Sequence, residues 1–97
     1  MARKRKERRV LDRAMQKDLD RRDKLAELEP GGSAERPLEV TTASLVEPVA
    51  KDLRCARCEG PLRVDDHAAR ASLRVVSLSC VACGASRVVY VRIAKAN

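Results

Sequence analysis

Four cysteines are the residues of this chain whose type and spacing point most directly to chemistry. They form two Cys-x-x-Cys pairs, Cys55 with Cys58 and Cys80 with Cys83, and 21 residues separate the two pairs. A Cys-x-x-Cys turn places two sulfurs on one side of a tight loop, where both can bind the same ion and where backbone N–H groups partly neutralise their charge. The spacing matches that of a four-cysteine zinc site. We therefore predict one structural Zn²⁺ ion, tetrahedrally bound with Zn–S distances of about 2.3 Å.

A glycine follows each cysteine pair and is expected to shape the loop. Gly84 comes directly after Cys83, and Gly60 lies two positions after Cys58. Glycine adopts positive φ angles without steric cost, and turns of this kind often require such an angle. We therefore expect both glycines to supply positive φ angles.

The residues around the cysteines alternate in the manner of short β-strands. Leu62 and Val64 alternate before the polar stretch Asp65-Asp66-His67, which we expect to be a turn. Two further apolar runs follow, and the break in alternation of the first predicts a β-bulge. These runs are Leu73, Val75, Val76 and Leu78, and then Val89, Val91 and Ile93. The pattern predicts a small metal-stabilised β domain over residues 53–97, with three short antiparallel strands.

Residues 53–93 resemble a zinc ribbon, the small rubredoxin-like β fold shared by many transcription, translation and RNA-modification proteins. The resemblance rests on two motifs, each followed by a strand: Cys55-Ala-Arg-Cys58-Glu-Gly-Pro-Leu62 and Cys80-Val-Ala-Cys83-Gly84. It covers less than half of the chain. Because several ribbon families share these motifs, the resemblance implies a fold and a metal site but no particular function.

Two alternatives to structural zinc remain at this point. The first is iron in a rubredoxin-type centre, but Tyr90 is the only aromatic residue and the aromatic core of such proteins is absent. The second is a pair of redox disulfides, although nothing around the cysteines predicts the βαβ frame of a thioredoxin. Catalytic zinc needs an open coordination position, and four sulfurs leave none. Structural zinc is the interpretation that we favour.

Residues 1–29 form a charged segment without Pro or Gly, which predicts an α-helix from about Glu7 to Leu28. Leu11, Met15 and Leu19 recur every four residues, so the helix has a narrow apolar face. A single helix of this kind is only marginally stable in water. We expect it to need a partner surface.

The next two segments connect this helix to the β domain. Residues 30–37, which begin with Pro30-Gly31-Gly32, predict a flexible linker. Within residues 38–52, Leu38, Val40 and Thr42 alternate as in a strand. However, Ser44-Leu-Val-Glu47 resembles a capping box that opens a short helix, with Pro48 tolerated in its first turn. We favour the short helix.

The N-terminal end carries a dense cluster of positive charge. The chain has a net charge of +7, and residues 3–9 hold six bases against the single acid Glu7. Such a cluster is typical of a phosphate-contacting arm, but the same pattern also fits a solvated tail or a site for a protein or an anionic membrane. We favour contact with nucleic acid or a ribonucleoprotein, directed at the backbone because Tyr90 alone offers little for base stacking. The candidate residues are Arg3, Lys4, Arg5, Lys6, Arg8 and Arg9.

The sequence contains no group of residues that predicts catalysis. His67 is the only histidine and is expected in a surface turn, and the adjacent Asp65 and Asp66 would point to opposite sides of a strand. The chain also has no phosphate-binding glycine loop. We therefore expect neither an enzyme nor a small-molecule substrate.

The remaining expectations concern location and overall role. No apolar run approaches the roughly 18 residues of a membrane span, and no hydrophobic stretch follows the basic start as in a secretory signal. Reduced metal-binding cysteines fit a cytoplasmic, reducing compartment. We predict a non-enzymatic zinc protein that contacts nucleic acid through residues 3–9. The alternative is an adaptor whose ribbon and amphipathic helix dock on a partner protein.

Overall fold

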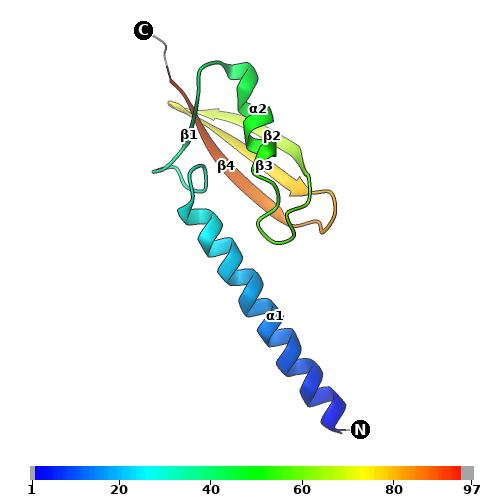
Figure 1. Cartoon of the computed structure of the whole chain (residues 1–97). Coiled ribbons are helices and arrows are strands. Elements are labelled where there is room, and N and C mark those ends of the chain that lie inside the picture. Colours follow the sequence, from blue (N-terminus) through cyan, green and yellow to red (C-terminus); the bar gives the residue numbers. More distant parts are fainter. Residues whose placement is uncertain (1, 95–97) are drawn as a thin grey trace.

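A long N-terminal helix, α1 (Ala2–Leu28, 27 residues), leads into a small sheet domain. The computed structural model describes residues 2–94, with side-chain surroundings from Val10 onward. Figure 1 shows α1 extending away from the sheet, and the molecule measures 67 × 24 × 18 Å. The predicted helix is confirmed, although it begins before Glu7. Of the helices within residues 2–94, none combines the length and the apolar sequence that a membrane crossing requires.

The sheet has four strands in the order β1-β4-β3-β2, one more than the three that the sequence predicts. β2 (Leu62–Arg70), β3 (Leu73–Cys80) and β4 (Ser86–Ile93) pair antiparallel, as expected. The additional strand is β1 (Leu38–Val40), which runs parallel to β4. Leu38 and Val40 alternate as in a strand, but β1 is only three residues long, and from the sequence alone we favour a short helix for this segment. Its alignment is fixed in part by an ion pair between Glu39 and Arg92, which are register partners.

The polar stretch Asp65-Asp66-His67 is part of β2, so the prediction of a turn there is wrong. Asp66 pairs with Ser77 and His67 with Val76, and the chain turns only after Arg70. The bulge also lies in β2, between Val64 and Asp66, and not in the run from Leu73 to Leu78. β2 is an edge strand, where polar residues can face solvent and an extra residue can be accommodated.

Residues 38–52 contain both of the structures that the sequence suggests. After β1, a 3₁₀ turn (Ala43–Leu45) leads into α2 (Val46–Asp52), which carries Pro48 in its first turn. The predicted capping box does not form, because Ser44 lies inside the 3₁₀ turn. Its hydroxyl oxygen lies 2.9 Å from that of Thr42 instead.

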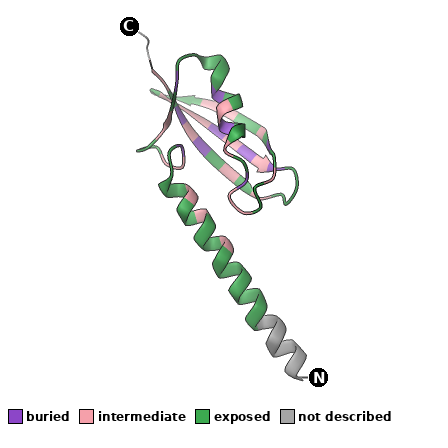
Figure 2. Cartoon of the chain, viewed as in Figure 1, coloured by how far each residue is buried: buried purple, intermediate pink, exposed green. Residues whose placement is uncertain are grey.

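The hydrophobic core lies between α2 and one face of the sheet (Figure 2). Val46 and Ala50 of α2 are fully buried, and they meet alternate residues of β3 and β4. Aliphatic side chains fill this core, as expected for a chain with a single aromatic residue. The buried apolar residues are Val40, Val46, Ala50, Cys55, Leu62, Val76, Leu78, Cys80, Val89 and Val91.

Residues 30–37 make specific contacts with the sheet. The N–H of Gly31 donates to the carbonyl of Arg36 at 2.6 Å, and the N–H of Tyr90 donates to the carbonyl of Gly31 at 2.8 Å. The end of α1 is therefore held beside β4. The division of the chain at residues 29, 37 and 52 stays a prediction.

Candidate metal centre

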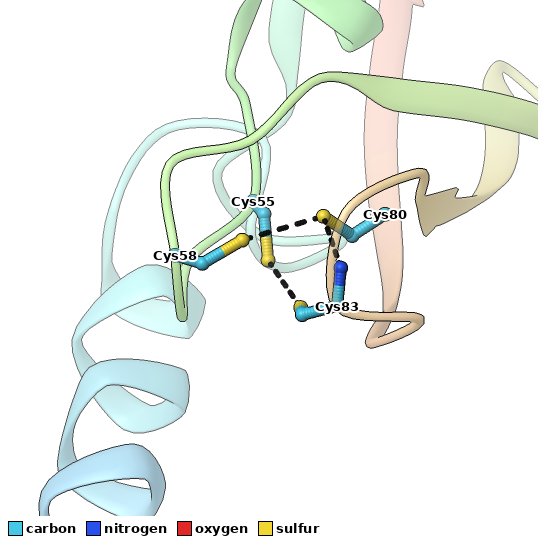
Figure 3. A group of neighbouring side chains, drawn as sticks. All are labelled: Cys55, Cys58, Cys80 and Cys83. Carbon is cyan, nitrogen blue, oxygen red and sulfur yellow. Dashed lines mark hydrogen bonds between the residues drawn. The ribbon is translucent and has the colours of Figure 1, made fainter.

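The four cysteines come together at one end of the sheet. Their sulfur atoms all lie within 4.8 Å of one another, and Figure 3 shows the side chains converging from two loops. The sulfurs of Cys58 and Cys80 are 3.4 Å apart, and those of Cys55 and Cys83 are 3.6 Å apart. A tetrahedron of sulfurs around an ion at about 2.3 Å has edges of about 3.8 Å. The group could therefore hold a metal ion after only small adjustments.

Two loops of closely similar backbone geometry present the sulfurs. In the first, the N–H of Cys55 donates to the carbonyl of Gly60, and that of Glu59 donates to the carbonyl of Cys55. The second loop has the same two hydrogen bonds at equivalent positions. The N–H of Cys80 donates to the carbonyl of Ala85, and that of Gly84 donates to the carbonyl of Cys80. The core fixes both loops, because the first cysteine of each pair is buried while Cys58 and Cys83 are exposed.

Backbone amides near the sulfurs favour negative charge on them. The N–H of Arg57 donates to the sulfur of Cys55, and the N–H of Cys83 donates to the sulfur of Cys80, both at 3.4 Å. The latter bond is the main reason that the pKa of Cys80 falls to about 6. The loop therefore stabilises a thiolate, the form of cysteine that binds metal.

The thiol of Cys58 behaves in the opposite way. The backbone N–H of Gly60 lowers its pKa, but hydrogen bonds with Cys80 and Cys83 and the loss of hydration outweigh that effect and raise the pKa to about 12. One negative charge in the cluster thus disfavours a second. A divalent cation at the centre would remove this conflict by attracting all four thiolates.

The two glycines have different roles, and the expectation for Gly60 was wrong. Gly84 has a φ angle of 77°, as expected, whereas the positive angle in the first loop belongs to Glu59, at 62°. Gly60 is needed for space instead. A Cβ atom there would lie 3.1 Å from the sulfurs of both Cys58 and Cys80.

The C-terminal half of α1 packs beside the cysteine loops, a contact that no sequence motif predicts. Asp23 forms an ion pair with Arg57 at 2.8 Å, and Arg22 donates to the carbonyl of Arg57 at 2.6 Å. Leu19 lines a shallow hollow together with Cys58 and Cys83. The hydrogen bonds from Arg57 hold the pKa of Asp23 below its ordinary value, so this ion pair is complete at neutral pH and is lost only in acid.

Among the described residues, His67 and Asp65 do not join this centre. His67 lies in β2 with its Nδ1 atom 3.2 Å from a carboxylate oxygen of Glu47, and Asp65 accepts a hydrogen bond from Ser79. The side chains of the basic cluster lie outside the described residues. These are Arg3, Lys4, Arg5, Lys6, Arg8 and Arg9.

Arginines of the sheet domain are largely engaged within the molecule. Arg57, Arg63 and Arg92 each pair with a carboxylate, and Arg87 donates to the carbonyl of Arg54 at 2.8 Å.

Comparison with known proteins leaves the geometry of the centre as the main guide to function. No protein-family model, curated protein or solved structure matches the chain. The likeness to zinc ribbons therefore stays a resemblance in motif and strand pattern. The donor set itself, four cysteine sulfurs near tetrahedral spacing, fits a metal ion with an affinity for thiolates.

Proposed function

We propose that this is a zinc-stabilised ribbon protein in which Cys55, Cys58, Cys80 and Cys83 hold one structural Zn²⁺ ion. The convergence of the four sulfurs within 4.8 Å carries the proposal. Thiolate ligands and tetrahedral spacing are typical of structural zinc sites. When bound, zinc supplies the positive charge that lets all four thiols ionise together.

The hydrophobic core is small, so a bound metal ion would contribute to the stability of the fold. Ten buried apolar residues, none aromatic, make up the core in the described part of the chain. Domains of this size often need a metal or disulfides to fold. Structural zinc contributes apparent binding free energies of roughly 10–16 kcal/mol in small zinc-finger peptides, and that energy becomes folding free energy.

The proposal assigns the protein no catalytic role and no small-molecule substrate. Four sulfur ligands complete a tetrahedral shell, so substrate would find no open position on the ion. We also assign the protein to a reducing compartment, the cytoplasm, where thiolates stay available for the metal.

The second part of the proposal is that residues 3–9 contact nucleic acid or a ribonucleoprotein. Their net charge is +5, from six bases and Glu7. They lie at the far end of α1 from the sheet domain (Figure 1), where the backbone of a long polyanion could be approached. The pairing of Arg57, Arg63 and Arg92 with carboxylates supports confining the contact to this end.

Fluorescence anisotropy with labelled oligonucleotides at several salt concentrations tests this second part. At most five neutralised phosphates give a log–log salt slope no steeper than about −4.5 for duplex DNA and about −3.5 for single strands. Affinity should depend little on base sequence. Replacing the six bases by Ala should abolish salt-sensitive binding while leaving the zinc content unchanged. An intact chain that shows no such binding even at low ionic strength would exclude the role.

A protein–protein adaptor is the second candidate function. It is supported by Leu11 and Met15, which are exposed on α1, whereas Leu19 is half-buried beside the cysteine loops. A pull-down from native extract with and without nuclease separates the two candidates. A stoichiometric partner that resists nuclease and is lost on Leu11→Ala/Met15→Ala substitution supports the adaptor.

A further inference from the structure

α1 carries a second regular pattern on its exposed surface. Leu11, Leu25 and Leu28 are 63%, 56% and 67% exposed. Together with three other exposed residues they recur at alternating steps of three and four, the spacing of the contact seam in a coiled coil. The seam residues are Leu11, Ala14, Asp18, Arg21, Leu25 and Leu28.

Most of the seam is turned away from the rest of the molecule, although Leu25, 56% exposed, also lines a hollow beside the first cysteine loop. Leu19, Asp23 and Ala26 are the half-buried residues of α1 within 10–28, and they face the sheet domain. At 3.6 residues per turn, the centre of the seam lies about 140° around the helix from the centre of that contact. A second helix could therefore pack along the seam without displacing the cysteine loops.

The sequence of the seam is complementary to itself when two copies run antiparallel. Leu11 then faces the partner's Leu28, and Ala14 faces the partner's Leu25. At the centre, Asp18 faces the partner's Arg21, and the two-fold axis repeats each pair. Leucine layers thus close both ends of the interface, and two opposite-charge pairs occupy its middle.

A parallel pair would not have this complementarity. Asp18 would meet Asp18 and Arg21 would meet Arg21, and like charges across a helix interface are destabilising. The Oδ2 atom of Asp18 already forms an ion pair with Nε of Arg22 in the same helix at 3.1 Å, which leaves Oδ1 for a partner's arginine. The central charges therefore select orientation and register, the best-attested use of polar residues in such seams.

We propose that α1 is a dimerisation helix that pairs antiparallel with α1 of a second copy of this chain. The partner helix supplies the apolar surface that a single exposed helix of this kind lacks. The seam does not include residues 3–9, so this inference is independent of the proposed nucleic-acid contact.

Light scattering after size-exclusion chromatography tests the pairing with two charge variants of the full zinc-loaded chain. Asp18→Arg places arginine against arginine in its own dimer, and Arg21→Asp places aspartate against aspartate. Each variant alone should be monomeric at concentrations where the wild type is a dimer. An equimolar mixture should recover the dimer, because the arginine introduced in one variant then faces the aspartate introduced in the other.

A matched control uses Asp12→Arg, which makes the same charge change on the opposite side of α1 and should leave the dimer intact. Near 0.15 M salt, the long-range repulsion between the positive chains is largely screened. A wild type that stays monomeric at all concentrations would overturn the proposal. So would single variants that remain dimeric, or a mixture that remains monomeric.

Discussion

At the scale of single residues, the two cysteine loops require a positive φ angle at the same position but place different residues there. Glu59 and Gly84 each follow the second cysteine of a pair and have φ angles of 62° and 77°. For a residue with a Cβ atom, the left-handed conformation raises the free energy by about 1–2 kcal/mol, whereas glycine has no such strain. The first loop is therefore strained at Glu59, and the second is relaxed at Gly84.

Glu59→Gly should stabilise the zinc-loaded protein, because relief of the left-handed strain exceeds the extra backbone entropy that glycine brings to the unfolded chain. The expected gain is up to about 1 kcal/mol in the free energy of unfolding. Gly84→Ala is the matched control and should lower it by about 1–2 kcal/mol, although open space surrounds that position. Denaturant unfolding measures both changes. Loss of stability in Glu59→Gly would contradict the account.

Gly60→Ala should weaken metal binding more than it strains the backbone. The added methyl group would lie 3.1 Å from the sulfurs of Cys58 and Cys80, so the ligands must shift from their positions around the ion. Competition with a zinc chelator should show a lower zinc affinity for this variant than for Gly84→Ala. Equal affinities in the two variants would mean that the close approach of Gly60 has no role.

At the scale of the elements, α1 lies beside the metal centre. Leu19 lines the hollow that also contains Cys58 and Cys83, and the Asp23–Arg57 ion pair holds the helix there. Removal of residues 1–29 should still leave the zinc content unchanged, because all four cysteines lie beyond them. What α1 changes is access to the site.

Leu19→Ala should therefore speed the release of zinc to a chelator without changing the amount of zinc bound at equilibrium in its absence. The smaller side chain opens a path for water and chelator to the exposed sulfurs. Met15→Ala, one turn earlier on the same helix and 64% exposed, is the control and should release zinc at the wild-type rate. Stopped-flow measurement with a chromogenic chelator gives both rates. Identical release from Leu19→Ala and wild type would rule out a covering role.

The elements also show where sequence patterns succeed and where they fail. The strong signals predicted α1, the antiparallel strands and the grouping of the four cysteines. The weaker features depended on neighbours that no local pattern reveals. β1 exists because β4 offers it an edge, and Asp65-Asp66-His67 stays extended because β3 pairs with it. The contact of Asp23 with Arg57, 34 residues apart, likewise follows from the fold alone.

At the scale of the whole molecule, the metal centre is connected both to the hydrophobic core and to α1. Cys55 and Cys80 belong both to the ligand set and to the buried core. Metal binding and folding of the sheet domain should therefore be coupled, as in other small zinc domains. Each Cys→Ser substitution is expected to cost ordered structure as well as zinc.

Native mass spectrometry of the reduced, purified chain tests this central claim most directly. We predict one zinc ion per chain, bound with the release of the thiol protons of its ligands. The spectrum of Cys80→Ser should lack that ion and show the broad charge distribution of an unfolded chain. A compact wild-type chain that carries no metal, or one that carries iron in place of zinc, would contradict the account.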